Sequence, residues 1–290
     1  MASLKEVRGR IASVTSTRKI TSAMKLVSAS KLRRAQEAIA NYLPYQKKLT
    51  AVLEDFLAST TDEISLPLAQ TREVKRVAII AISSNGSLCG AFNSNVIKKT
   101  EEVLARYKHL PPKDILVYPL GKKVAEALKR NGLIAAHDFN EQVDKPDYNE
   151  VAKIADELIE LFVTKQIDAV ELVYNHFKNA AVQQIIADKY LPMAATIPEG
   201  EQKAQANYII EPNTDYLIAT LAPKVMRLRL YSALLDSIAA EHGARTTAMQ
   251  IATDNAGDLI QELKLKYNKA RQEAITNEIL DIVGGAEGLK

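Results

Sequence analysis

A short loop in the middle of the chain is the part of the sequence whose residue types most suggest a chemical site. The segment "NGSLCG", residues 85–90, follows an apolar run, and a glycine-containing turn after a strand can bind phosphate at the start of a helix. The loop has neither the G-x-G-x-x-G nor the G-x-x-x-x-G-K-[ST] spacing of nucleotide-binding loops, so this signal is weak. Its cysteine, Cys89, has no His or second Cys nearby, and we expect it to be buried and inert.

The histidines are the other candidates for chemistry. They lie far apart and form no metal-ligand spacing. The four positions are His109, His137, His176 and His242. We therefore predict no catalytic residue, no cofactor and no metal site. A nucleotide-dependent enzyme stays an alternative, but it would need a phosphate loop and an acidic ribose partner, and the sequence shows neither convincingly.

The composition is that of an ordinary soluble protein. The chain has 290 residues, of which 47% are hydrophobic and 25% charged, enough for one large domain or two smaller ones. The single cysteine excludes an internal disulfide and fits a reducing compartment. No apolar run reaches the roughly 18 residues of a membrane span, and the start "MASLKEVRGR" lacks the apolar segment of a secretory signal.

The positive charge is concentrated at one end of the chain. Residues 1–50 contain eleven Lys and Arg against two Glu, a net charge of +9, whereas the whole chain carries only +3. The remainder therefore sums to about −6. An acidic partner is expected to meet the first fifty residues.

Two very long helices are predicted at the ends of the chain. No glycine occurs between Gly9 and Gly86, and the pattern predicts a helix over residues 4–58, about 80 Å long. Pro44 should bend it or end it locally. A second helical pattern covers residues 213–284, about 105 Å. Both lengths are several times that of an average globular helix.

The middle of the chain reads as an inserted Rossmann-like α/β domain over residues 75–193. Short apolar runs bounded by turn residues alternate with helical segments, which implies a parallel sheet covered by helices and finished by an antiparallel hairpin around "KNA" (178–180). The expected strands are 77–82 and 115–120, a weaker one at 133–139, and the two of the hairpin, and the expected helices are 94–108, 122–132 and 149–165.

The two long helices are predicted to pair as an antiparallel coiled coil. Steps of three and four residues select mostly apolar residues in both, and each seam becomes polar or small in its middle. Aligning the two polar stretches sets Thr21 by Met249 and Arg18 by Thr253. In this alignment the N-terminal end of the first helix lies opposite Tyr267 of the second, so residues 268–283 of the second helix should project unpaired. A helical bundle with further partners is the alternative. The fold class is thus α/β plus long helices, with three parts at 1–58, 75–193 and 213–284.

Long stretches at both ends resemble one known family. "KEVRGRIASVTSTRKITSAMKLVSASKLRRA" and "MQIATDNAGDLIQELKLKYNKARQEAITNEILDIVGGA" are similar to the γ subunits of F-type ATP synthases, as is the central "SSNGSLCGAFN". The resemblance covers the whole chain. It implies a non-catalytic rotor shaft that couples proton flow through the membrane c-ring to ATP synthesis. The implied partners are the α and β subunits of the head, the ε subunit and the c-ring, with attachment to the inner membrane only through the complex.

The resemblance also implies partner-binding residues. Met24, beside Lys25, matches a methionine near the acidic loops of the catalytic subunits, and a small, basic helix face suits a partner that moves past it. Arg271 and Gln272 match a pair that reaches loops of a catalytic subunit near the tip of the shaft. The third implied contact, with the polar loops of the membrane ring, falls on Tyr208 and Glu211.

Two features leave other interpretations open. The family usually has a basic residue where Gly86 stands, which puts any contact by that charge in doubt. Without the resemblance, the basic first helix would also suit a coiled-coil scaffold or a nucleic-acid-binding protein. Against nucleic acid, the basic residues alternate with Ala and Ser, and no aromatic residue that could stack on a base occurs before Tyr42.

Overall fold

The computed structural model describes residues 4–59, 67–133, 135, 137, 139–193, 211 and 214–287. Its contacts group the chain into two compact units. One unit consists of residues 1–28 and 245–290, and the other of residues 29–244. Two long helices contribute residues to both units.

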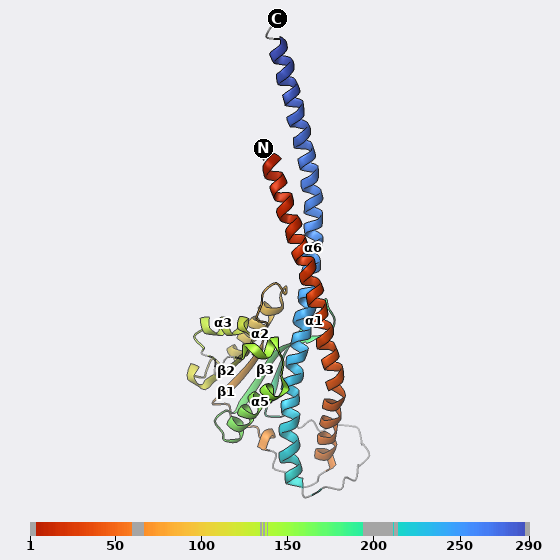
Figure 1. The fold of residues 1–290 in the computed structure, drawn as a ribbon. Helices are drawn as coiled ribbons and strands as arrows, with labels where there is room; N and C mark the ends of the chain where they lie inside the picture. Colours follow the sequence, from red (N-terminus) through yellow and green to blue (C-terminus); the bar gives the residue numbers. More distant parts are fainter. Residues whose placement is uncertain are drawn as a thin grey trace. The chain divides into compact units, whose positions relative to one another are not determined.

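The long helices confirm the prediction closely. Helix α1 spans Leu4–Ser59 and helix α6 spans Thr214–Glu287 (Figure 1). Both continue through an internal proline, Pro44 in α1 and Pro223 in α6. Of the two outcomes expected at Pro44, a bend or a local end, the local end does not occur. A proline removes one helix hydrogen bond, and the contacts of the flanking turns outweigh that loss. The polar segment "PEGEQKAQAN" (198–207), which precedes α6, lies outside the described residues.

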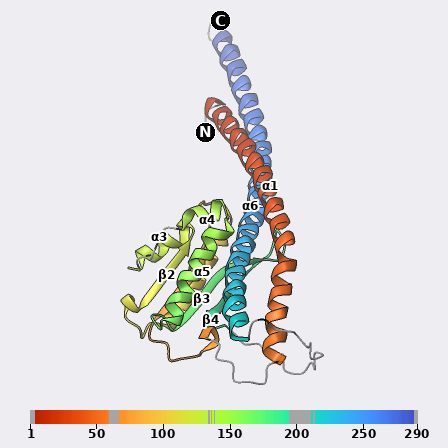
Figure 2. The same ribbon diagram turned by 60° about the horizontal axis from the view of Figure 1, so that its bottom comes forward.

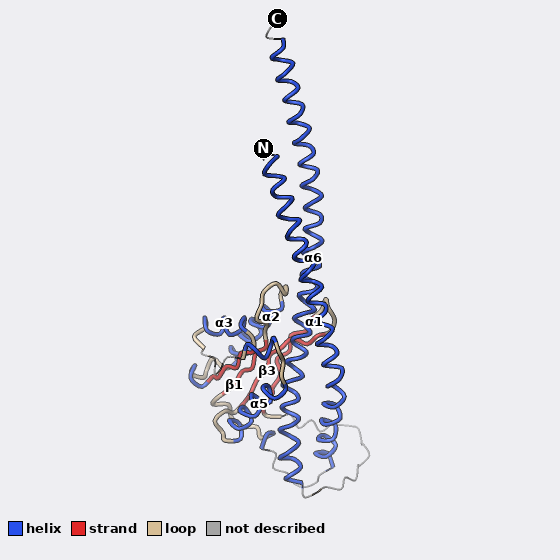
Figure 3. The backbone as a smooth tube through the Cα atoms, in the orientation of Figure 1, coloured by secondary structure: helices blue, strands red, loops and turns tan. Residues whose placement is uncertain are grey.

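The unit of residues 29–244 is built on a four-stranded sheet in the order β2-β1-β3-β4 (Figure 3). The strands are β1 (Val77–Ile82), β2 (Ile115–Leu120), β3 (Ala169–Phe177) and β4 (Gln183–Leu191). Strand β1 pairs in parallel with β2 and β3, and β3 pairs antiparallel with β4. The predicted parallel sheet with a final hairpin is therefore confirmed.

Helices cover both faces of this sheet. The helices of the inserted domain are α2 (Phe92–Arg106), α3 (Lys122–Arg130), α4 (Asn140–Asp144) and α5 (Tyr148–Val163). All six residues of β1 are buried, and they alternate between two apolar clusters. Val77, Ile79 and Ala81 join the cluster with α2 and α3, and the alternate residues join the cluster with α5 and α6. Figure 2 shows α5 beside α6, where Arg227 Nε donates to Asp156 Oδ1 at 2.6 Å. Helix α6 is thus the central core helix of this unit.

Two parts of the α/β domain differ from the prediction. The segment 133–139, expected as a weak strand, contributes one parallel bridge, Ala135 with Val117, among its described residues. Helix α4 was not predicted, because it has only five residues and too little periodicity to be recognised. The short 3₁₀ turns Pro67–Ala69 and Pro112–Asp114 were also not predicted.

An ionic cluster ties the start of the α/β domain to the turn before β3. The carboxylate of Asp168 accepts hydrogen bonds from Arg72 Nε at 2.6 Å and from the backbone N–H groups of Lys75 and Arg76 at 2.9 Å. The guanidinium of Arg72 also lies 4.4 Å from the centre of the Phe162 ring. Burial alone would raise the pKa of Asp168, but these donors outweigh it and hold the pKa below its ordinary value.

Three tyrosines fasten the second half of α1 to its neighbours in the same unit. The ring of Tyr231 in α6 lies 5.1 Å from that of Tyr42 in α1 and 5.6 Å from that of Tyr148 in α5, both edge to face. Such pairs contribute about 0.5–1.5 kcal/mol each beyond the area they bury. Burial raises the pKa of Tyr42 and Tyr231. The contact adds to the aliphatic packing of α1 against this core, to which Leu32, Ile39 and Leu49 also contribute.

Candidate partner-binding surfaces

In the unit of residues 1–28 and 245–290, α1 and α6 meet along a seam that is polar in its middle. The hydroxyl oxygens of Thr21 and Thr253 lie 2.8 Å apart, and Lys25 Nζ donates to Gln250 Oε1 at 2.8 Å. Gln250 Nε2 in turn donates to the carboxylate of Asp254. The buried seam residues nearby are Val7, Thr21 and Ser28 of α1 and Met249, Ala256, Ile260 and Leu263 of α6. The predicted polar centre of the coiled coil is confirmed.

The predicted register of this pair is wrong by about one helical turn. The alignment set Thr21 by Met249 and Thr253 by Arg18, whereas Thr253 contacts Thr21. Both side chains are short, so the contact fixes the register more firmly than a bond between long side chains would. Matching two threonines lets each hydroxyl lie beside another hydroxyl rather than an apolar methionine. The same shift also moves the predicted pairing of Val7 with Leu263.

The predicted partner-binding residues that the structure describes fall in both units, and each is described in its own unit. Lys25 is held by α6 through Gln250, and Met24 beside it is half-buried. Arg271 and Gln272 are exposed on α6, in the same unit. Glu211 is exposed, and Tyr208 lies outside the described residues. Their roles toward partners stay predictions.

A hollow of about 820 Å³ lies between the two helices near this polar centre. Its α1 side carries Arg18 and Lys19, both exposed, and its α6 side carries Asp254 and Asp258. The floor includes Gly257 and other small residues. Charges of opposite sign thus face each other across a groove with a small-residue floor.

Large apolar side chains also point to solvent from this part of α1. Ile20, Leu26 and Val27 are 60%, 66% and 58% exposed, and Ile251 of α6 is 55% exposed. Sequence reasoning stressed the small and basic residues of this face and missed these three. The signal was available, because Ile20 and Val27 are seven residues apart and both lie off the seam. Apolar residues exposed in a cluster on a helix are typical of an interaction surface.

Among the described residues, no helix packs against the last part of α6. Between residues 271 and 283 only Ala274 is partly buried, and Figure 1 shows the end of α6 running past the start of α1. The predicted unpaired tip is confirmed. Its exposed apolar residues are Ile275, Ile279, Leu280, Ile282 and Val283. These apolar side chains need a partner surface to bury them, and the described residues of this chain do not provide one.

The loop after β1 is closed by its own hydrogen bonds. The amide of Asn93 donates to the carbonyl oxygen of Gly86 at 3.0 Å, and its Oδ1 accepts from the backbone N–H of Ser84 at 3.1 Å. Cys89 is buried, with 1% exposure, which confirms its predicted burial. It packs with Phe92 and two alanines of α6.

The N-terminus of the neighbouring helix α3 is a second place where a phosphate could bind, but its N–H groups already donate to residues of the chain. The N–H of Lys122 donates to Asn85 Oδ1, that of Lys123 to the Ser84 carbonyl, and that of Val124 to Ser83 Oγ, at 3.0–3.2 Å. Gly121 permits this close approach, because it has φ +107° and an added Cβ would lie 2.2 Å from the Ser83 carbonyl oxygen. The N–H groups that would bind a phosphate are therefore engaged within the chain.

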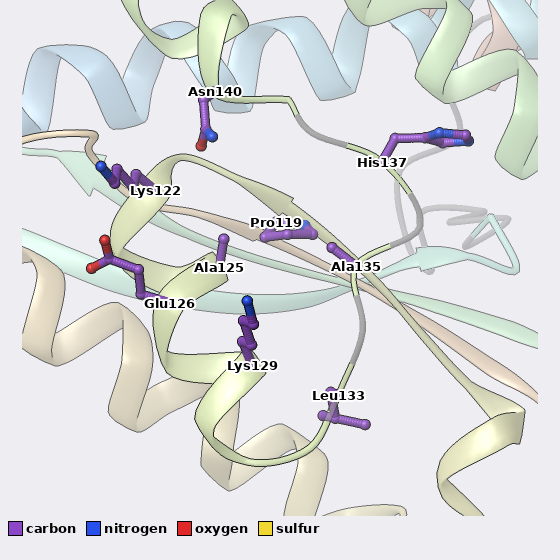
Figure 4. Close-up of a pocket in the computed structure, with 9 residues that line it drawn as sticks. All are labelled: Pro119, Lys122, Ala125, Glu126, Lys129, Leu133, Ala135, His137 and Asn140. Carbon is purple, nitrogen blue, oxygen red and sulfur yellow. The ribbon is translucent and has the colours of Figure 1, made fainter.

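A second hollow, of about 460 Å³, lies beside α3 at the edge of the sheet (Figure 4). Its floor is apolar and includes Pro119 and Ala125. The volume would suit a small molecule, but such sites have polar groups that converge on the ligand. Figure 4 shows Glu126 and His137 pointing away from each other on opposite sides. Glu126 and His137 therefore do not converge on one ligand.

Titratable side chains in the described ranges form no group of three His, Cys, Asp or Glu that could hold a metal ion. His176 does have a close partner, since its Nδ1 lies 2.5 Å from Asp236 Oδ2. This pair was not predicted, because its members are separated by 60 residues and no local pattern joins them. In the same part of the chain, no helix is both long and apolar enough to cross a membrane.

Comparison with known proteins gives a consistent result. A family profile described as "ATP synthase" matches residues 3–289. Proteins named ATP synthase gamma chain are 52% identical in Phocaeicola vulgatus, over 99% of both chains, and 48% identical in Flavobacterium johnsoniae, over 100% of this chain and 99% of that one.

Solved structures have the same fold. A chain from the central stalk and c-ring structure of the Tetrahymena thermophila mitochondrial ATP synthase has a TM-score of 0.57 at 25% identity, covering 80% of this chain and 99% of that one. A chain of the Euglena gracilis mitochondrial enzyme has a TM-score of 0.65 at 19% identity, over 99% and 94%. With the family profile, the close relatives and the long helices in agreement, the chain belongs to the γ subunits of F-type ATP synthases.

Proposed function

We propose that the chain is the central rotor shaft of an F-type ATP synthase and couples proton flow through a membrane ring to ATP synthesis and hydrolysis in a catalytic head. The observation that carries this proposal is the unpaired tip of α6, with five large apolar residues exposed along two to three turns. An enclosing ring of partner subunits would cover such a tip on all sides.

The chain's own role in this proposal is mechanical and not catalytic. The N–H groups at the start of α3 are engaged by Asn85, Ser84 and Ser83, and the loop after β1 is closed by Asn93. These contacts support a chain that neither binds nor hydrolyses ATP by itself. Chemistry would take place in the partners, and the shaft would change their conformations as it turns.

The proposed partners are the α and β subunits of the head, the ε subunit and the c-ring. Met24 and Lys25 would meet the acidic loops of the catalytic subunits, and Arg271 and Gln272 would meet loops nearer the tip. Tyr208 and Glu211 would meet the polar loops of the c-ring. The Tetrahymena structure, described as central stalk and c-ring, supports this last contact. The chain would lie peripherally at the cytoplasmic side of the inner membrane.

Substitution of Met24 by Lys tests the coupling role. Met24 is half-buried on the α1 face beside Lys25, so an ammonium group there would reach any acidic loop passing this face. Two unit charges 4 Å apart near a protein surface interact by up to about 4 kcal/mol, and that attraction must be broken at every step of rotation.

In the assembled complex, Met24→Lys should therefore lower ATP-driven proton pumping more than ATP hydrolysis. Met24→Gln is the matched control, because it adds polarity without charge and should leave both rates near those of the unaltered complex. Equal losses of pumping and hydrolysis in Met24→Lys, or no loss in either, would count against the proposed contact.

A further inference from the structure

In the unit of residues 29–244, the C-terminal part of α6 contacts the turn end of the β3–β4 hairpin. The carboxylate of Asp236 accepts from the backbone N–H of Phe177 at 2.9 Å and lies 2.5 Å from His176 Nδ1. One carboxylate on α6 thus binds two adjacent residues where β3 ends. This contact fixes the position of the hairpin along the axis of α6 and its orientation about that axis.

Two turns further along α6 the hairpin touches the helix backbone. A Cβ added at Gly243 would lie 2.8 Å from Cε2 of Phe177 and 3.4 Å from the Cα of Ala180. Carbon atoms pack best at about 3.5–4.0 Å, so the aromatic ring is seated where any side chain on residue 243 would be. On the same stretch, Ala240 and Ala244 pack with Cys89 and Phe92, which come from the loop after β1 and the start of α2.

A glycine in the middle of a helix needs a reason. It destabilises a helix by about 1 kcal/mol relative to alanine. At Gly243 the reason is the close approach of Phe177. Gly257 of the same helix has nothing within 4 Å of an added Cβ, so it provides a matched comparison without that contact.

We propose that Gly243 is a positioning residue of the rotor. It lets Phe177 and the loop of Cys89 pack closely on α6 between Asp236 and Ala244, and this contact region, the clasp, holds the α/β domain on the helix. The proposal rests on the rotor function. Its mechanical consequence is that the clasp resists movement of the α/β domain against α6 when torque acts on that domain.

The expected effect follows from a looser seat of the hairpin on α6. If Gly243→Ala displaces Phe177, the hairpin and the sheet that carries it are held less firmly against α6. The angular variance of a bead attached to the α/β domain should therefore rise above that of the unaltered complex.

The test uses the assembled complex with its head fixed to a surface and a bead attached at Lys113→Cys, an exposed position on the α/β domain. Angular variance is recorded at the ATP-waiting dwell, together with the rate of ATP hydrolysis. Gly243→Ala should widen the distribution without slowing hydrolysis. Gly257→Ala should leave it unchanged, and Gly243→Ala with Phe177→Leu should bring it back toward the original width.

Hydrogen exchange of the isolated chain gives an independent reading. Gly243→Ala should raise the exchange rate of the Phe177 amide about tenfold or more, since displacing Phe177 weakens the hydrogen bond from its N–H to Asp236. Asp236→Ala, which removes the acceptor, should do the same. Equal variance and equal exchange in Gly243→Ala and Gly257→Ala would overturn the proposal. A chain that fails to assemble with α and β subunits even when unaltered would instead refute the rotor function.

Discussion

Cysteines at Thr21 and Thr253 should form a disulfide that joins α1 to α6. Their hydroxyl oxygens lie 2.8 Å apart. Each oxygen is one bond from its Cβ, which places the two Cβ atoms about 4–5 Å apart, close to the ~3.8 Å of a disulfide. The native Cys89 is buried in the other unit and should not compete.

The size of the stabilisation can be estimated from the loop that the disulfide closes. The two positions are 232 residues apart, and the chain-entropy relation gives at most about 5.5 kcal/mol for a loop of that length. Replacing the two hydroxyls removes about 1 kcal/mol. The oxidised variant should therefore unfold at a clearly higher denaturant concentration than the same variant after reduction.

The assay is mobility on a denaturing gel after mild oxidation, followed by denaturant unfolding with and without reductant. A variant with cysteines at Thr21 and Met249 is the control for the alternative register, one turn or about 5.4 Å away. Faster cross-linking of that control would refute the assigned register. In the assembled complex the disulfide joins two helices of the same chain and does not link that chain to a partner subunit. The rate of ATP hydrolysis should therefore be unchanged.

Three other outcomes are expected. Arg271→Ala should alter turnover of the assembled head. Because the residue is exposed, the change in the free energy of unfolding of the isolated chain should be less than about 0.5 kcal/mol. A lowered melting temperature with normal turnover would give Arg271 a structural role. Asp168→Asn should destabilise the α/β domain by about 2 kcal/mol at neutral pH. The pKa of Asp168 is lowered in the folded state, so its contribution to the free energy of unfolding is complete above the unfolded pKa of about 3.9 and is lost as the pH falls through the folded value. The urea midpoints of the unaltered protein and the variant should therefore converge between pH 6 and pH 2, and a constant difference between them would contradict this. Tyr107→Phe should cost about 1–3 kcal/mol by leaving the buried Glu171 carboxylate without its 2.8 Å phenol donor, and Glu171→Leu in the same background should recover part of that loss in urea unfolding.

The elements with a strong periodic signal were predictable from the sequence. Strands β1 and β2 have the predicted bounds, because short apolar runs between turn residues have few other structures open to them. Helix α1 has nearly its predicted length, because no glycine occurs beyond Gly9 within it. Helix α4 and the bridge at Ala135 depend on contacts distant in sequence and have no such local pattern.

The site was less predictable than the fold. Aligning polar stretches located the centre of the coiled coil but not its register, because a one-turn shift changes the composition of each layer very little. The pairing of Thr21 with Thr253 depends on how closely the helices approach. The contact of Gly243 with Phe177 was invisible for the same reason, since a helical glycine alone does not reveal which side chain lies over it. Partner-binding residues depend on surfaces outside the chain.

The separation of Thr21 from Thr253 also has a consequence for biosynthesis. The first residues of α1 leave the ribosome 232 residues before the part of α6 that covers them. At about 5–20 residues per second, that interval lasts roughly 10–50 s. During it, the segment 4–28 must stay soluble without its partner helix. Polar residues interrupt the seam of this segment at Arg18, Thr21, Lys25 and Ser28, and this interruption favours solubility through that interval. A continuous stripe of Leu and Ile would be prone to aggregate before α6 was made.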